Sequence, residues 1–437
     1  MKEKKIKLIF ESLETSKYSI FIFVLSIFLI NIIFYLFKLP DDRALLFTPS
    51  SPGWLVGDFG SYKNQPVLQL FREFLLGLST ESSIKIGPFL PALILISQKL
   101  FISNLLVKIF AIFAGISNIL LIHSIIPKMF TDISWVNKFK YFKFFGKTFK
   151  ISSLDFSSLL GFALNPLILY YFAFPSTDAF FTTTFFIVLL FSIDLTTSLK
   201  KSKFLSHIDL KRIWIISFTL LIGMLIRTSG ILNFFLIIIP CYILIRSFNK
   251  YWRKLIVPSI FLSYIVIFST KYYLPYAKWS SQHNLDWTNG ISLWNTPLAS
   301  RNWETNKLNN IMAHTLSFPF KFSESSGLRP SYVTIKDGEE MLTNTKKISE
   351  SNKPFFYIFL RSNWAFFVVI PSFIMFIINI ISNPSLEKFI FLIAIISVPL
   401  ILTYSIVLER YFIHCSSLLA CLFLPLFNDI KENLKKK

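Results

Sequence analysis

Four charged residues stand in sequence settings where their side chains could do chemistry. Asp58 is flanked by Gly57 and Gly60, so a bulky ligand can approach its backbone closely and its carboxylate could act as a general base. Asp178 supplies a second carboxylate at a predicted helix start. Arg227 and Arg410 carry guanidinium groups, which bind phosphate through two parallel hydrogen bonds. This set of residue types suits proton transfer next to a phosphate group.

Each of these residues also has a structural interpretation. Asp58 can serve a plain Gly-Asp turn, where aspartate is common for its local hydrogen bonds. Asp178 can complement the dipole of the helix that follows Pro175-Ser176-Thr177. Arg227 can anchor a tight turn before Gly230, and Arg410 can pair with Glu409. The sequence leaves both interpretations open at all four positions.

Aromatic residues near the same segments are candidates for binding an acceptor or a sugar ring. Trp54 and Tyr62 lie on either side of Asp58, and Trp287 lies in a later polar segment. The alternative is an aromatic belt at a membrane surface, where tryptophan and tyrosine are enriched.

Several enzyme classes lack the residues that they need. The five histidines show neither an HExxH pattern nor a nucleophile elbow, and the chain has neither a P-loop nor a glycine-rich dinucleotide loop. The three cysteines, Cys241, Cys415 and Cys421, have no spacing typical of a disulfide framework or a zinc site. Metalloprotease, serine hydrolase and ATP-driven transport chemistry are therefore not indicated.

The composition indicates an integral membrane protein. The 437 residues include 45 Lys and Arg against 24 Asp and Glu, a net charge of +21, yet 53% of residues are hydrophobic and 16% are charged. Soluble domains carry roughly 25% charged residues. Because the basic residues lie between long apolar runs, we expect contact with membrane lipids and no nucleic-acid partner.

The elements that must position the candidates are membrane helices. Apolar runs of spanning or nearly spanning length predict about ten of them, at about 19–37, 101–125, 157–174, 178–199, 213–229, 230–248, 255–274, 355–380, 388–408 and 410–428. The expected fold class is an all-α integral membrane protein with two long outer loops, 39–99 and 275–354. The first run is an uncleaved helix rather than a signal peptide, because no small-residue cleavage site follows it.

The distribution of Lys and Arg predicts the orientation. Nearly every basic cluster falls on the side of the N-terminus, which is the cytoplasmic side by the positive-inside rule. Both termini are then cytoplasmic, and the chain divides into a membrane module at 1–274, an outer loop region at 275–354 and C-terminal helices with a basic tail at 355–437. Asp58, Asp178, Arg227 and Arg410 all fall at the outer face.

The pattern resembles the polytopic GT-C glycosyltransferases, which include protein O-mannosyltransferases and lipid A aminoarabinose transferases. The resemblance rests on Gly57-Asp58-Phe59-Gly60-Ser61-Tyr62 in the first outer loop, Asn165-Pro166 through Asp178, Arg227-Thr228-Ser229-Gly230 and Glu409-Arg410-Tyr411. It implies a bacterial inner-membrane enzyme with a polyprenyl-phosphate sugar donor, inversion at the anomeric carbon, and a glycan, lipid or protein as acceptor.

The resemblance also assigns roles to the candidates. Asp58 would be the general base, and Arg227 and Arg410 would hold the donor phosphate. Asp178 would orient the acceptor or help bind a divalent cation, for which oxygen ligands favour Mg or Mn.

Two rival functions stay open. A membrane polysaccharide polymerase or O-antigen ligase would use residues of the second outer loop, namely His283, Arg301, His314 and Arg329. A lipid or polysaccharide transporter or flippase would use the same charges to line a path, although the chain shows no internal repeat.

Overall fold

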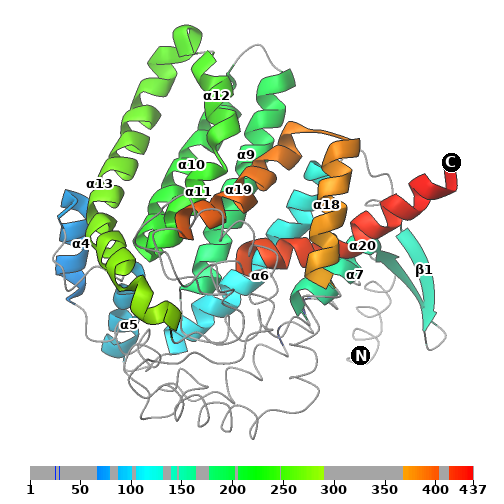
Figure 1. Ribbon diagram of the computed structural model, residues 1–437, viewed down its shortest axis with the longest axis horizontal. Coiled ribbons are helices and arrows are strands. Elements are labelled where there is room, and N and C mark those ends of the chain that lie inside the picture. The colour runs from blue at the N-terminus through cyan, green and yellow to red at the C-terminus, as the bar shows by residue number, and fades with distance from the viewer. Residues whose placement is uncertain are drawn as a thin grey trace, which may run out of the picture.

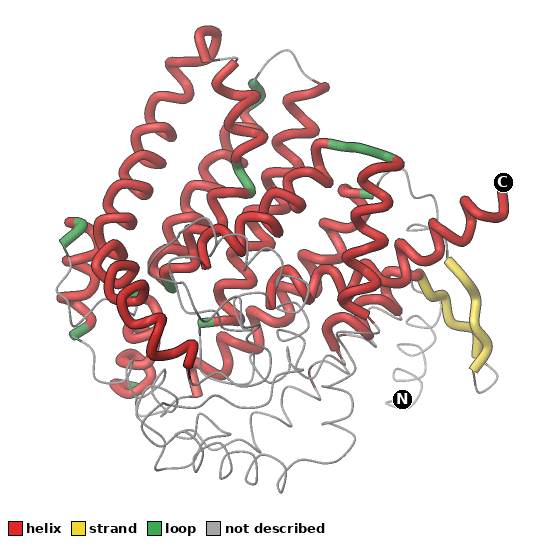
Figure 2. The backbone as a smooth tube through the Cα atoms, viewed as in Figure 1, coloured by secondary structure: helices red, strands yellow, loops and turns green. Residues whose placement is uncertain are grey.

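The structure is a computed structural model that describes residues 66–78, 87–100, 105–130, 139–144, 147–163, 177–201, 205–246, 248–289, 368–402 and 413–436, with the single positions Leu25 and Leu29. The described part is helical except for one hairpin of two strands (Figures 1 and 2). The elements are α4 (Val67–Leu76), α5 (Phe89–Lys99), α6 (Leu105–Met129), β1 (Phe139–Phe144), β2 (Lys147–Ser152), α7 (Ser153–Ser158), η2 (Leu159–Ala163), α9 (Asp178–Lys201), α10 (His207–Ile226), η3 (Thr228–Ile231), α11 (Leu232–Phe235), α12 (Ile238–Arg246), α13 (Phe248–Asn289), α18 (Ile370–Ser382), α19 (Leu386–Leu402) and α20 (Ile413–Lys436).

Four of the described helices are long and apolar enough to cross a membrane. They cover Ile109–Met129 in α6, all of α9, Lys250–Leu274 in α13 and Ile413–Lys431 in α20. Each overlaps a span predicted from the sequence, so the all-helical membrane class is confirmed. The other expected spans fall on shorter described helices or outside the described residues, and the count of ten stays a prediction.

Helix α9 is the central element of the described fold. In the apolar stretch of α9, 78% is buried inside the protein, whereas in that of α13 only 28% is buried. Helix α13 therefore has a side available to lipid, and α9 does not. A helix that is apolar on all sides belongs inside a bundle. Helices α6, α10, α19 and α20 pack against α9, and the two long helices α9 and α10 run next to each other (Figure 1).

Helix α10 begins at His207, six residues before the predicted span, because a capping box starts it there. The Ser206 N–H donates to Asp209 Oδ2 over 3.0 Å, and the Asp209 N–H donates to Ser206 Oγ over 3.1 Å. This reciprocal pair satisfies two backbone donors that a helix start otherwise leaves open. Arg212 Nη1 adds a bond of 2.8 Å to Asp209 Oδ1.

The expected helix over 230–248 is broken into α11 and α12. The break lies at Leu236–Ile237, just before Pro240 in the first turn of α12. Proline has no N–H to donate to the preceding turn, so a helix tolerates it best near its start. At the entry to α11, a Cβ on Gly230 would overlap the carbonyl of Gly223, so this turn needs glycine.

Three further features differ from the expected layout. Strands β1 and β2 form an antiparallel hairpin between the predicted spans 101–125 and 157–174, where no strand was predicted, and it projects at one edge of the molecule (Figure 2). Helices α4 and α5 lie within the expected outer loop 39–99. Helix α13 continues past Leu274 to Asn289, so the start of the expected loop at 275 is helical.

Candidate active site

Asp178 and Arg227, predicted separately from the sequence, form an ion pair at one end of the helix bundle. Arg227 Nη1 lies 2.5 Å from Asp178 Oδ1 and 3.4 Å from Thr177 Oγ1. The Asp178 side chain is fully buried and the Arg227 side chain is 8% exposed. A charge buried this deeply is costly in free energy without a partner, so the two residues depend on each other.

The local sequence explains why these two residues meet. Asp178 is the first residue of α9, where a carboxylate complements the positive end of the helix dipole. Arg227 follows the last residue of α10 in an extended conformation, and its N–H donates to the carbonyl of Gly223. Because α9 and α10 are antiparallel neighbours of similar length, the start of one lies beside the end of the other.

The Phe181 ring lies against Arg227 of the pair, and His414 packs against Phe181 and Phe185. The Arg227 guanidinium lies 4.2 Å from the centre of the Phe181 ring, a cation–π geometry. His414, the second residue of α20, packs 5.0 Å from the Phe181 ring and 4.3 Å from the Phe185 ring, centre to centre. Three helix ends, those of α9, α10 and α20, therefore build one buried polar cluster. We call it the outer-end cluster (Asp178, Phe181, Arg227 and His414), after the face predicted for it from the sequence.

His414 is the residue of this cluster that the sequence did not single out. It is fully buried, and within the described part of the chain neither of its ring nitrogens has a hydrogen-bond partner. Its only sequence signal was its place four residues after Arg410, since it belongs to no histidine motif. Buried polar atoms are nearly always bonded, so an exception at a candidate site calls for a reason.

Asp178 pairs with Arg227 in the structure. Its Oδ1 accepts a bond from the guanidinium, so it directs and balances the charge of Arg227. The roles predicted for Asp178, orienting the acceptor or helping to bind a divalent cation, stay predictions.

Most other predicted site residues lie outside the described residues. These are Asp58, Tyr62, Trp54 and Arg410, together with Arg301, His314 and Arg329 of the rival interpretation. Trp287 and His283 lie in the last turns of α13, where the backbone alone is described. Arg410 precedes the first residue of α20, Ile413, by three positions.

No group of three His, Cys, Asp or Glu side chains among the described residues is arranged to hold a metal ion. Asp178 engages Arg227 instead. The possible Mg or Mn site therefore stays a prediction that involves residues outside the described part.

A second polar cluster lies near the C-terminal end of α6, where His123 faces α7. Ser158 Oγ is 3.0 Å from His123 Nε2, and His123 Nδ1 is 3.8 Å from Asp155 Oδ1. The residue types are those of a serine hydrolase, but Ser158 is 1% exposed and the distance between His123 and Asp155 is too long for a hydrogen bond. We interpret it as polar packing between α6 and α7.

Comparison with known proteins gives a distant likeness. No model of a protein family matches the sequence, and no curated protein sequence matches it significantly. Among solved structures, ArnT from Cupriavidus metallidurans in the apo state matches at 11% identity and a TM-score of 0.45, over 93% of this chain and 59% of that one. The same protein bound to undecaprenyl phosphate matches at 14% identity and a TM-score of 0.45, over 94% and 61%.

This chain thus spans less than two thirds of the length of the structures it matches.

Proposed function

We propose that this chain is a membrane glycosyltransferase. It moves a sugar from a polyprenyl-phosphate donor to an acceptor at the outer face of the membrane, with inversion at the anomeric carbon. The observation that carries the proposal is the outer-end cluster, in which a buried arginine is fixed by a buried aspartate where the ends of α9, α10 and α20 meet. An arginine held in one orientation is suited to a phosphate ester, because its planar group offers paired donors.

The proposed reaction is a single displacement. Asp58 removes the proton of the acceptor hydroxyl as its oxygen attacks the anomeric carbon. The bond from that carbon to the phosphate oxygen breaks, and its electron pair leaves with the lipid phosphate. Arg227 and Arg410 stabilise the negative charge that grows on the phosphate, and Asp178 keeps Arg227 in place. Trp54, Tyr62 and Trp287 would bind the sugar or the acceptor.

Transfer assays with purified protein in detergent test the proposal. A radiolabelled sugar on synthetic undecaprenyl phosphate is the donor, and binding of undecaprenyl phosphate is measured separately. We expect Asp58→Asn to lower turnover by about 10²–10⁴-fold with donor binding intact, the usual contribution of a positioned base. Arg410→Ala should weaken donor binding as well as turnover, because a phosphate contact exists in the ground state too.

Asp194→Asn is the matched control. Asp194 lies on α9 like Asp178, but toward the other end, where Lys128 Nζ binds its Oδ1 over 2.5 Å. The turnover of the Asp194→Asn variant should match that of the wild type. Full activity of Asp58→Asn would remove Asp58 from the mechanism, and loss of activity confined to Arg301 and His314 variants would favour the polymerase or ligase.

A further inference from the structure

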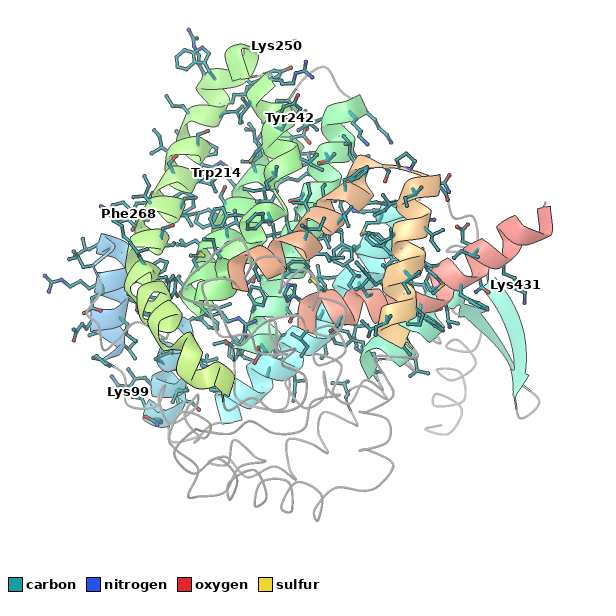
Figure 3. All side chains as sticks on the ribbon, in the orientation of Figure 1. Lys99, Trp214, Tyr242, Lys250, Phe268 and Lys431 are labelled. Carbon is teal, nitrogen blue, oxygen red and sulfur yellow. The ribbon has the colours of Figure 1, made fainter. Side chains whose placement is uncertain are left out.

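Four basic residues gather where α12 ends and α13 begins, far from the outer-end cluster. They are Arg246, Lys250, Arg253 and Lys254, all exposed, and we call them the basic tip. Figure 3 shows Lys250 at one extreme of the molecule and Lys99 at the opposite one. The proposed transferase function does not use this surface.

Exposed aromatic and aliphatic side chains lie among these charges. Tyr242 is 59% exposed, Trp252 47% and Ile245 70%. The Arg246 guanidinium lies 5.8 Å from the Tyr242 ring and the Arg253 guanidinium 5.5 Å from the Trp252 ring. Cations, aromatic rings and aliphatic side chains exposed together are typical of a segment at the headgroup level of a bilayer.

Three of the four residues of the basic tip are not balanced by an acid in the described part of the chain. The sequence has no Asp or Glu from Leu210 to Leu285, and among described residues Arg246, Arg253 and Lys254 enter no ion pair. The acids of neighbouring helix ends are already engaged, with Asp209 bound to Arg212 and Glu387 to Lys200. The positive potential of this surface is therefore directed outward.

The spacing of the charges makes the positive potential unfavourable without an anion. Lys250, Arg253 and Lys254 are three and four positions apart, so they share one face of α13 and repel each other. They also lie in the first two turns of that helix, where its dipole disfavours cations. A bound anion would relieve both effects.

We propose that the basic tip binds the headgroups of anionic phospholipids. The guanidinium and ammonium groups would contact the headgroup phosphates, and Trp252 and Tyr242 would lie at the boundary with the acyl chains. The apolar residues that follow on α13 favour a lipid over a free phosphate, because Val257 and Ile260 are exposed and would be covered by acyl chains. A soluble anion would leave these side chains uncovered.

A melting experiment in neutral detergent tests this proposal. Short-chain phosphatidylglycerol, short-chain phosphatidylcholine and inorganic phosphate are titrated into the full-length protein. We expect phosphatidylglycerol to raise the melting temperature of the wild type and the other two to leave it unchanged. One basic residue near an anionic membrane surface raises the affinity for that surface by a factor of about five. The triple variant K250Q/R253Q/K254Q should therefore need on the order of 100-fold more phosphatidylglycerol.

The control removes three charges from the opposite end, in the variant R72Q/K99Q/K271Q, whose replaced side chains are also exposed. It should respond to phosphatidylglycerol as the wild type does. The tip variant should melt no lower than the wild type without lipid, since it loses internal repulsion, and this shows that it folds. An equal response of both triple variants, or an equal effect of phosphatidylcholine or free phosphate, would overturn the proposal.

Discussion

At the scale of single residues, the outer-end cluster combines a buried ion pair with a buried histidine ring that has no hydrogen bond in the described part of the chain. Asp178 and Arg227 balance each other, whereas His414 packs against Phe181 and Phe185 without a hydrogen bond in the described part of the chain. Stability and function should therefore depend on these residues in different ways, and two sets of variants separate them.

The first prediction concerns the ion pair. Removing one partner leaves the other as an uncompensated buried charge, so Asp178→Asn and Arg227→Gln should each lower the free energy of unfolding by about 3–5 kcal/mol. The double variant should lose less than the sum of the two. Melting of the four proteins in detergent gives the coupling. Additive losses would show that the pair does not act as a unit.

The second prediction concerns His414. Leaving a polar group buried without a partner costs about 1–3 kcal/mol, and phenylalanine has a similar ring without that cost. His414→Phe should therefore melt at or above the temperature of the wild type while sugar transfer falls. Comparison with His414→Gln, which keeps a polar group, assigns the loss of activity to the missing nitrogen atoms. A lower melting temperature of the phenylalanine variant would mean that the ring has a structural partner.

At the scale of elements, helix ends carry most of the specific interactions. The capping box fixes the start of α10, and Lys200 Nζ binds Glu387 Oε1 over 2.8 Å, which joins the end of α9 to the start of α19. These contacts lie where helices emerge from the apolar region, so they determine how the spans are arranged beside one another.

The third prediction concerns pH and the capping box, which lies outside the four candidate spans. Burial opposes the charge of Asp209, but hydrogen bonds from Ser206, Ser198 and Arg212 outweigh it and lower the pKa of this carboxyl. A lowered folded-state pKa contributes stability that is present above the ordinary pKa of an aspartate, 3.8, and is lost as the pH falls through the lowered value.

Melting curves between about pH 6 and pH 3 check this, because the wild type should lose stability faster than Asp209→Asn over the acidic part of that range. Ser206→Ala should cost about 1 kcal/mol near neutral pH, the usual contribution of such a cap. Identical pH profiles of the wild type and Asp209→Asn would contradict the assignment.

The sequence predicted the elements with strong local signals and missed those set by tertiary contacts. The start of α9 at Asp178 follows from Pro175 and two hydroxyl residues, and the end of α10 near Arg227 follows from the glycine after it. The residues of the capping box at Ser206 are present in the sequence. They were missed because the span was predicted from apolar residues alone and begins only at position 213. His414 could not be found, because its neighbours Phe181 and Phe185 are more than two hundred positions away in the chain.

At the scale of the whole molecule, the two ends of the described bundle differ in chemistry. One end holds the outer-end cluster, in which charges are buried and paired. The other holds the exposed basic tip, with Lys250 labelled in Figure 3, and the ion pairs of Lys128 with Asp194 and of Lys200 with Glu387. The orientation predicted from the positive-inside rule, in which the end with the basic tip is cytoplasmic, stays a prediction.

The fourth prediction is this orientation. An impermeant maleimide should label Ser281→Cys in intact cells and Ser202→Cys only after permeabilisation. Of the native cysteines, Cys415 and Cys421 are buried, so Cys241→Ser removes the one that is partly exposed. Labelling at Ser202 rather than at Ser281 in intact cells would reverse the topology and place the outer-end cluster in the cytoplasm.

Under the proposed function, the length of α13 bears on the size of the acceptor. Its candidate span ends at Leu274, and the helix continues to Asn289, which adds roughly 22 Å at 1.5 Å per residue. Trp287 is therefore carried along this helix well beyond the apolar span. A short acceptor can reach either the helix tip or the bilayer surface, whereas an extended chain can reach both. If transfer rates rise with acceptor length until the acceptor spans the roughly 22 Å extension of α13, this extension acts as a molecular ruler.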